Sequence, residues 1–219
     1  MTTDDATHAP LSDEELLRLH VAGDPRGYRE LVDRFAAELH RFLMRFLGQP
    51  ALVEDVIQET FLQVHVSATR FDPTRRVKPW LFTIAANKAR DLIRTRTRRR
   101  EMSLDGSGSS EDAGSLLDVF VDPGDAPDQE MSEDDESRRV RRAVSQLSAH
   151  LREVLILGYY HQLPYKEIAE ILDVPIGTVK SRLHAAVAQF GDIYRRETGT
   201  AGAPLKRNSE PRGSFIRET

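Results

Sequence analysis

The stretch YKEIAEILDVPIGTVKSRLHAAVAQF, from Tyr165 to Phe190, decides the fold of the C-terminal part of this chain. Apolar residues recur in it at helical spacing, in a first set before residue 173 (Ile168, Ala169, Leu172) and a second set after residue 175 (Val179, Leu183, Ala186, Phe190). Pro175 lies between the sets and disfavours helix at the residue before it. The stretch therefore predicts a helix-turn-helix, whose second helix could lie in a DNA major groove. An ordinary buried helical hairpin is the alternative.

Composition excludes several classes of function. The chain of 219 residues has no cysteine, so disulfides, thiolate metal sites and cysteine nucleophiles are excluded. Its seven histidines lack metal-binding spacing, and no nucleophile or phosphate-loop motif is present, so we expect no enzyme activity, metal or cofactor. No apolar run approaches membrane-spanning length and the first twenty residues are polar and acidic, so we expect a cytoplasmic protein.

The charge is divided unevenly along the chain. The net charge is −4, but residues 1–100 carry 17 basic and 14 acidic residues, and residues 138–219 carry 14 basic and 8 acidic ones. Residues 101–137 carry 13 acidic residues and no basic one. Two mildly basic regions therefore flank a strongly acidic strip, which is also rich in Gly, Ser and Asp and is expected to be a flexible linker.

Capping signals predict four helices in the N-terminal half. Ser12 with Glu15 forms a capping box before the first, and Asp24 with Pro25 opens the second, which Gly48 ends. The second has an apolar stripe of Leu31, Phe35, Leu39, Phe42 and Phe46, and Pro50 opens a third with core positions Val53, Ile57, Phe61 and Val64. Pro79 is expected to open a fourth.

The fourth predicted helix carries a basic run. Seven basic residues lie between Lys88 and Arg100, and they follow the aromatic residues Trp80 and Phe82 and the amide Asn87. Aromatic faces, amides and cations together are typical of a single-strand nucleic-acid surface. The alternative is a solvated charged face with Trp80 in the core.

The sequences of these segments resemble those of a known family. The C-terminal stretch, with IAEIL followed by GTVKSRL, is similar to the promoter-reading helix-turn-helix of sigma-70 family sigma factors, particularly the extracytoplasmic-function (ECF) group. LuxR-type response regulators have similar sequence motifs. A response regulator would begin with alternating strands and helices, whereas the N-terminal half of this chain is predicted to be helical. EDVIQETFLQVH (Glu54 to His65) and KPWLFTIAANKARDLIR (Lys78 to Arg94) resemble the sigma domain that binds polymerase and melts the −10 element.

The resemblance implies an all-α fold of two small helical domains joined by the flexible acidic linker. It divides the chain into a segment with a short helix (1–23), sigma domain two (24–100), the linker (101–137), sigma domain four with the helix-turn-helix (138–197) and a disordered tail (198–219). Asp173 replaces the glycine common at the turn, and aspartate can adopt the left-handed conformation that this position requires.

The resemblance also assigns residues. The positions that match the clamp-docking helix for RNA polymerase are Asp55, Gln58, Glu59, Phe61 and Leu62. Those that match −10 recognition and melting are Trp80, Asn87, Lys88, Arg90 and Arg94, and those that match the −35 helix are Thr178, Lys180, Ser181 and Arg182. The family often has further arginine where this chain has His184, Ala185 and Ala186, so Lys166 and Arg195 are candidates for part of the phosphate contact.

The function that follows is an ECF-type sigma factor without enzymatic activity. Its expected partners are core RNA polymerase (clamp and flap), double- and single-stranded promoter DNA, and an anti-sigma factor, with no membrane insertion. The alternative is a helix-turn-helix regulator that acts without direct polymerase association. The acidic-polar face of the third predicted helix favours the sigma factor, because a simple repressor does not need it.

Overall fold

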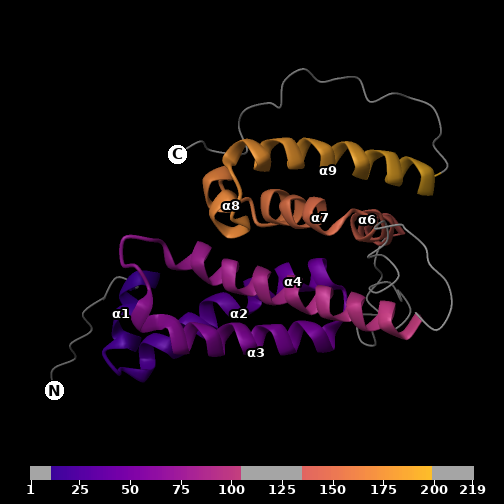
Figure 1. Ribbon diagram of the computed structural model, residues 1–219. Coiled ribbons are helices and arrows are strands. Elements are labelled where there is room, and N and C mark those ends of the chain that lie inside the picture. Colours follow the sequence, from indigo (N-terminus) through magenta and orange to yellow (C-terminus); the bar gives the residue numbers. More distant parts are fainter. Residues whose placement is uncertain (1–10, 105–134, 199–219) are drawn as a thin grey trace.

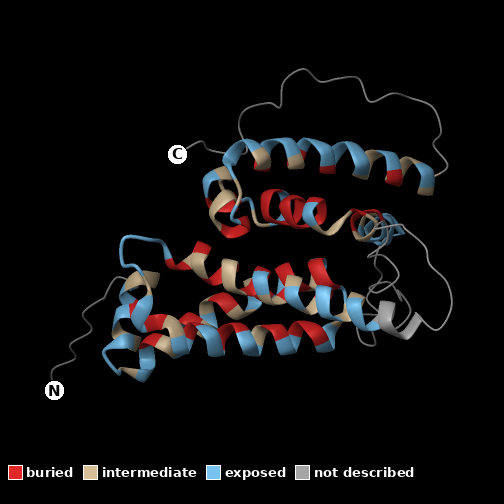
Figure 2. Ribbon diagram, viewed as in Figure 1, coloured by how far each residue is buried: buried red, intermediate tan, exposed pale blue. Residues whose placement is uncertain are grey.

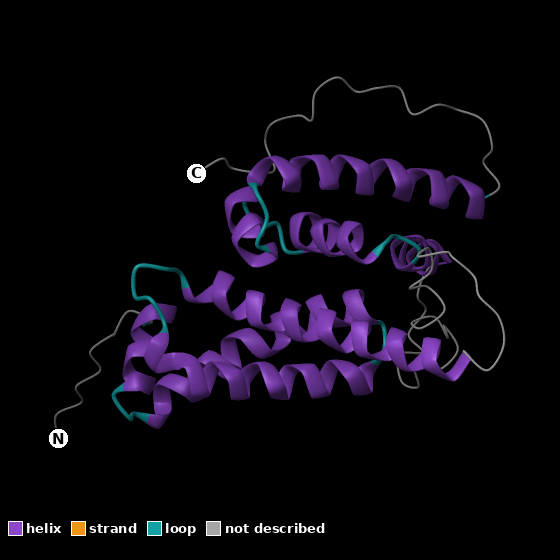
Figure 3. Cartoon of the chain, in the orientation of Figure 1, coloured by secondary structure: helices purple, strands orange, loops and turns teal. Residues whose placement is uncertain are grey.

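The structure is a computed structural model that describes residues 11–104 and 135–198, and within these ranges every regular element is helical (Figure 3). The N-terminal region comprises α1 (Asp13–Val21), α2 (Pro25–Leu47), α3 (Pro50–Ser67), the short 3₁₀ helix η1 (Ala68–Arg70) and α4 (Val77–Leu104). The C-terminal region comprises α6 (Asp135–Ser145), α7 (Ala149–Leu155), the π-helical η2 (Ile156–Tyr160), α8 (Tyr165–Leu172) and α9 (Ile176–Glu197). The predicted all-α fold is confirmed.

The predicted linker and tail fall mostly outside the described residues. Only the ends of the linker segment, 101–104 and 135–137, are described, and both are helical because α4 continues to Leu104 and α6 begins at Asp135. Of the predicted tail, only Thr198 is described. Among the described helices, none is long and apolar enough to cross a membrane.

The predicted caps of the first helices are confirmed. The Ser12 amide donates to the Glu15 carboxylate at 2.7 Å, and the Glu15 amide donates to the Ser12 hydroxyl at 3.2 Å, which completes the capping box of α1. Asp24 accepts a hydrogen bond from the Arg26 amide at 2.9 Å and thereby caps α2. Gly48 ends that helix with φ of 76°, a left-handed conformation that costs glycine little.

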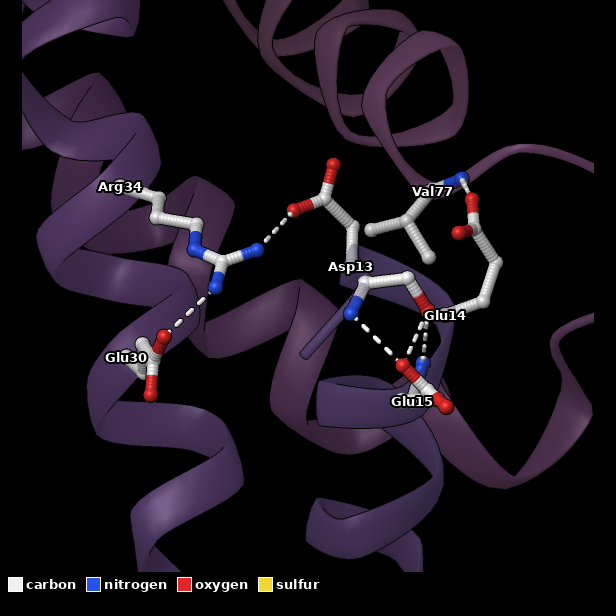
Figure 4. Close-up of polar contacts among 7 residues, drawn as sticks. Asp13, Glu14, Glu15, Glu30, Arg34 and Val77 are labelled. Carbon is white, nitrogen blue, oxygen red and sulfur yellow. Dashed lines mark hydrogen bonds and ion pairs between the residues drawn. The ribbon is translucent and has the colours of Figure 1, made fainter. Parts of the chain in front are cut away.

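Helix α4 begins at Val77, before the predicted Pro79. The Val77 amide donates to the Glu14 carboxylate at 3.0 Å, so a side chain from α1 provides the acceptor that the first turn of α4 needs (Figure 4). Beside it, Arg34 of α2 donates to Asp13 at 2.9 Å and to Glu30 at 2.6 Å. These contacts connect α1 to both longer helices. The sequence pattern missed this start because the capping acceptor lies 63 residues away.

The predicted stripe of α2 forms the core of the N-terminal region. Its five members are buried (Leu31, Phe35, Leu39, Phe42, Phe46), as are three of the predicted core positions of α3 (Val53, Phe61, Val64), while Ile57 is partly buried (Figure 2). Burying side chains of this size stabilises a fold by roughly 1.5–3 kcal/mol each. Phe82 of α4 completes this core, with its ring 5.6 Å from that of Phe42.

The C-terminal region is built around α7 and η2. The sequence predicts LREVLILGYY as one helix buried on nearly every side, and residues 151–158 are indeed buried. The prediction is wrong at its end, where the helix widens into the π turn and Tyr159 and Tyr160 are 60% and 41% exposed. The sequence predicts Ser148 as the N-cap of this helix, and it does precede α7, but its side chain forms no cap hydrogen bond.

Candidate nucleic-acid interface

The predicted helix-turn-helix is formed by α8 and α9. Helix α8 ends at Leu172, and Asp173 adopts φ 52° and ψ 52°, so the predicted left-handed aspartate is confirmed. The Val174 amide donates to the Ala169 carbonyl at 3.1 Å, which closes the end of α8. The Thr178 amide donates to the Pro175 carbonyl at 2.8 Å in the first turn of α9. The turn thus fixes the direction in which α9 leaves.

The two faces of α9 separate as the periodicity predicts. The apolar stripe is buried at Val179, Leu183 and Ala186, and Phe190 packs partly buried against the core, with its ring 5.7 Å from that of Tyr194. Among the predicted −35 residues, Lys180 and Ser181 are exposed, while Thr178 and Arg182 are partly buried. Helix α9 lies on the outer side of the C-terminal region, away from α2 and α3 (Figure 1). Its exposed face is therefore available to DNA.

Arg182 faces inward more than the pattern predicts. Burial raises the pKa of the Glu153 carboxyl on α7 to about 7, and the positive charges of Arg90 and Arg182 oppose that shift. The pKa of His150 is lowered by burial and, to a smaller extent, by Arg182. Arg182 is thus close enough to α7 to act on two of its titratable groups. Its role as a base-reading residue stays a prediction, and it also has an electrostatic role inside the region.

The aromatic residues of α4 have different positions. The Trp80 ring is partly buried and lies 4.7 Å from the ring of Phe71, so one aromatic pair sits at the start of α4. Phe82 is fully buried between Phe42 and His161, with centroid distances of 5.6 and 5.5 Å. The expectation that Phe82 offers a face to a nucleic-acid base is therefore wrong, because the core occupies that ring. Trp80 alone stays a candidate for base contact.

The polar −10 candidates follow one another along α4. Arg90 donates to the Asn87 side chain at 2.8 Å, and its Nε lies 3.5 Å from the Glu153 carboxylate. Arg94 is exposed and pairs with Asp91 at 3.0 Å. Asn87, Arg90 and Arg94 recur at three- and four-residue steps, so they share one side of the helix. This side can contact both phosphates and bases.

Lys88 lies next to the expected polymerase-binding face. Its ammonium group is 3.3 Å from the Glu59 carboxylate of α3, and Glu59 itself is exposed. Asp55, Gln58 and Leu62 are also exposed on α3. Phe61, by contrast, is 6% exposed and its carbonyl accepts a hydrogen bond from Tyr28 at 3.0 Å. It supports α3 from the core side and does not present a surface to a partner.

Sequence reasoning missed Val66, which extends this α3 face. Leu62 and Val66 are 62% and 64% exposed and lie one helical turn apart, next to Gln58 and Glu59. Two neighbouring apolar side chains in water on an otherwise ordinary helix indicate a contact surface. The spacing of Val66 four residues after Leu62 is the signal that could have identified it. Within the described residues, no group of three His, Cys, Asp or Glu side chains could hold a metal ion.

Comparisons with known proteins identify the family to which this chain is related. Residues 31–99 match the family model described as Sigma-70 region 2, and residues 137–190 match that described as Sigma-70, region 4. The chain is 30% identical to the ECF RNA polymerase sigma factor SigW of Bacillus subtilis over 162 residues, which are 74% of this chain and 86% of the relative. It is 37% identical to SigL of Mycobacterium tuberculosis over 162 residues, covering 73% and 84%.

Solved structures show the same helical arrangement. The structure of CnrH in complex with the cytosolic domain of CnrY is 25% identical, covers 84% of this chain and 98% of that one, and has a TM-score of 0.62. The sigma factor RpoE in complex with the anti-sigma factor NepR from Bartonella quintana is 25% identical, with coverage of 77% and 96% and a TM-score of 0.60. The chain belongs to the sigma-70 family of RNA polymerase sigma factors, in its ECF group.

Proposed function

We propose that this chain binds core RNA polymerase, reads the −35 and −10 promoter elements and promotes DNA melting at the start of transcription. In this proposal residues 24–100 and 138–197 are the two functional domains. The exposed face of α3 binds the polymerase clamp through Asp55, Gln58, Glu59 and Leu62. The C-terminal domain contacts the flap, and the protein works in the cytoplasm without catalysing a reaction itself.

The α3 face is the observation that carries the proposal. A regulator that acts without polymerase needs a helix-turn-helix but not a second surface on a separate helical region. Here Leu62 and Val66 add exposed apolar area beside the polar Gln58 and Glu59. Interfaces commonly combine such an apolar centre with a polar rim. The face therefore favours a sigma factor over a free-standing regulator.

The DNA-reading roles follow from the two basic helices. In α9, Thr178, Lys180, Ser181 and Arg182 would contact the −35 element. In α4, Trp80 would stack on a base exposed by melting, Asn87 would hydrogen-bond to it, and Lys88, Arg90 and Arg94 would hold phosphates. Lys166 is exposed near the turn and can add a phosphate contact there.

An anti-sigma factor is the third expected partner. RpoE of Bartonella quintana, which is similar to this chain, was solved in complex with the anti-sigma factor NepR. The similar fold of the two proteins supports a corresponding partner for this chain.

Run-off transcription with core polymerase tests the proposal. The purified chain added to core enzyme should give discrete transcripts from promoters with separated −35 and −10 elements, and core enzyme alone should not. A pull-down with core polymerase separates the two candidate functions. If the chain binds promoter DNA but does not bind core polymerase under any condition, it is a regulator of the second kind.

A further inference from the structure

Two histidines from separate helices of the N-terminal region face each other. His20 lies in the last turn of α1, and His65 lies in the last turn of α3. The Nε2 atom of His20 is 3.2 Å from the Nδ1 atom of His65, although 45 residues separate the two in the sequence. Spacing along the sequence, on which the expectation of no metal rests, does not reveal this pair. The fold thus brings together two side chains of the kind that bind metal ions.

The distance between the two nitrogens fits a shared metal ion. Zn²⁺ binds imidazole nitrogen at about 2.0–2.1 Å, so an ion bound to both atoms would have an N–metal–N angle of roughly 100–106°, close to the tetrahedral value. The two ring centres are 5.0 Å apart. An ion in line with both rings would place the centres at about this separation, because each centre would lie roughly 3.2 Å from the ion. Both distances therefore agree with one ion between the rings.

A neutral histidine pair can present both facing nitrogens to an ion. When the two rings hydrogen-bond to each other, one facing nitrogen carries the proton, since a neutral imidazole has one donor and one acceptor. Transfer of that proton to the outer nitrogen of the same ring keeps the ring neutral and leaves two lone pairs that face the ion. Burial and, to a smaller extent, the charge of His65 lower the pKa of His20, which favours the neutral ring.

The surrounding helices hold the two rings in place. Tyr28 of α2 packs on both, with its ring centre 4.8 Å from that of His20 and 5.6 Å from that of His65. Its hydroxyl donates to the Phe61 carbonyl of α3 at 3.0 Å, which fixes the phenol ring between α2 and α3. Helix α1 in turn packs against α2 and against η1, which directly follows α3. Because the ligands are already positioned, binding of an ion orders few side chains.

The pair is accessible to solvent, and its chemistry selects a class of ion. His20 is partly buried, whereas His65 is exposed. Within the described residues, no third His, Cys, Asp or Glu side chain completes the group, so water would occupy the other positions around the ion. Imidazole nitrogen suits Zn²⁺, Ni²⁺ and Cu²⁺, whereas Mg²⁺ and Ca²⁺ prefer oxygen ligands.

We propose that His20 and His65 form a two-ligand site for a divalent transition-metal ion of the Zn²⁺, Ni²⁺ and Cu²⁺ class. The bound ion joins the end of α1 to the end of α3, in addition to the ring packing around Tyr28. Since an ion that binds only the folded chain stabilises it, the site adds a metal-dependent contribution to the stability of the N-terminal region. Neither histidine is assigned to polymerase or DNA, so this inference does not rest on the proposed function.

Isothermal titration calorimetry with Ni²⁺ alone tests the site on the full-length chain without an affinity tag. His65→Ala is the first variant, because His65 is exposed and its removal should leave the fold intact. Loss of one ligand removes the advantage of two linked ligands, so His65→Ala and His20→Ala should each weaken Ni²⁺ binding by about tenfold. The control His40→Ala removes another exposed histidine, on α2, and should bind Ni²⁺ like the unmodified chain.

The double variant distinguishes one shared ion from two independent ones. Removal of either ring already breaks a shared site, so adding the second substitution should weaken Ni²⁺ binding much less than the first did. Independent losses that add fully would overturn the shared site. Unchanged Ni²⁺ affinity in His65→Ala would also overturn it, because the ion would then be held by other side chains.

Cu²⁺ reports the number of imidazole ligands directly. Pulsed electron paramagnetic resonance of the chain with one equivalent of Cu²⁺ should show two coordinated imidazoles, and His65→Ala should show one fewer. A single imidazole in the unmodified chain would overturn the two-ligand site.

Thermal unfolding gives an independent measurement. Saturating Ni²⁺ should raise the unfolding midpoint of the unmodified chain by several degrees, whereas Mg²⁺ at the same concentration should not. His65→Ala should abolish the Ni²⁺ effect and His40→Ala should keep it, with circular dichroism to check that each variant is folded. An equal Ni²⁺ effect in His65→Ala would show that the stabilising ion binds elsewhere and would overturn the proposal.

Discussion

Glu153 is the residue with the most unusual environment in the described chain. Its carboxyl group is buried, and its Oε1 has no hydrogen-bond partner although it lies 3.5 Å from the Arg90 Nε. The positive charge of Arg182 on α9 also acts on it. Burial raises its pKa from 4.5 to about 7 despite the nearby positive charges. The free-energy cost of burying the ionised carboxylate therefore exceeds its favourable electrostatic interaction with Arg90 and Arg182.

The first prediction is a pH dependence of stability that Glu153→Gln removes. The folded protein keeps a proton on Glu153 up to about pH 7, whereas the unfolded chain releases it near 4.5. The folded state therefore binds more protons between these values, and stability falls as pH rises from about 4.5 to 7, by roughly 3 kcal/mol. Urea unfolding at several pH values measures this. The matched control Glu54→Gln, at an exposed position, should keep the wild-type slope.

The second prediction concerns Arg182. Arg182→Ala removes a positive charge beside the buried Glu153 and should cost about 1–3 kcal/mol of stability at pH 8, where that carboxylate is ionised. Arg182→Lys should recover most of the stability. It should not recover the recognition of guanine, which needs the bidentate hydrogen bonds of a guanidinium group. The exposed Arg196→Ala is the control for charge alone. Promoter discrimination unchanged in Arg182→Lys would show that Arg182 reads no base.

At the scale of elements, helix starts depend on both near and distant partners. Ser12 and Asp24 cap their helices through residues two or three positions away, so their roles are visible in the sequence. The start of α4 depends on Glu14, which belongs to another helix. The same holds at the end of α2, where Arg152 supplies the partner of the Phe46 carbonyl. Backbone groups at helix ends in this protein are thus hydrogen-bonded by side chains of other helices.

The third prediction tests the distant cap. Glu14→Ala removes the acceptor of the Val77 amide and should lower the free energy of unfolding by about 1 kcal/mol, as for loss of a helix N-cap. Glu30→Ala, which removes only one of the two partners of Arg34 on the surface, should cost less than half as much. Urea denaturation of both variants provides the comparison. Equal losses would show that the cap contributes nothing beyond ordinary surface charge.

The fourth prediction concerns the α3 face. Leu62→Ser with Val66→Ser should leave stability nearly unchanged, since both side chains are mostly exposed. Affinity for core polymerase should fall by about ten- to a hundredfold, because each side chain would bury apolar area in the complex. Val21→Ser, an exposed valine at the end of α1, is the control. Full polymerase affinity in the double variant, measured by fluorescence anisotropy, would remove α3 from the interface.

The sequence predicted the elements and the faces better than it predicted the partners of single side chains. Period and capping are local properties, so the stripes of α2 and α9 and the turn at Asp173 are as expected. Phe82 was misassigned because an aromatic residue beside a basic run looks the same in sequence whether it is buried or exposed. Arg152 and Glu153 were not identified, since their partners are on helices far along the chain and no spacing rule connects them.

At the scale of the whole molecule, the C-terminal region packs on the N-terminal region through α8 against α4 and through α6, α7 and η2 against α2, which makes the two regions dependent on each other. The end of α2 is satisfied by Arg152, and the burial of Glu153 is eased by Arg90 of α4. Separation of the regions would return these groups to water and leave each core exposed along one side. Hydration of the charges offsets part of the cost of separation, so a contact rich in charges opens more easily than an apolar one.

The last prediction is that the regions unfold together when they are packed and separately when the contact between them is weakened. Differential scanning calorimetry of the free protein should show one transition, because each region stabilises the other. The double variant Arg45→Glu with Arg76→Glu places acidic groups opposite the Tyr160 ring and the Glu167 carboxylate. It should split the transition in two, with the less stable region melting several degrees lower.

A matched pair of charge reversals controls for the change in net charge. Arg18→Glu with Arg70→Glu alters the same number of charges on α1 and η1, which pack within the N-terminal region. This control should keep one transition, although its midpoint can shift. Addition of Glu167→Arg to the first variant should bring the two transitions closer together by restoring one pairing. Two transitions already present in the unmodified protein would mean that the regions are independent, and the contact would then contribute no cooperativity.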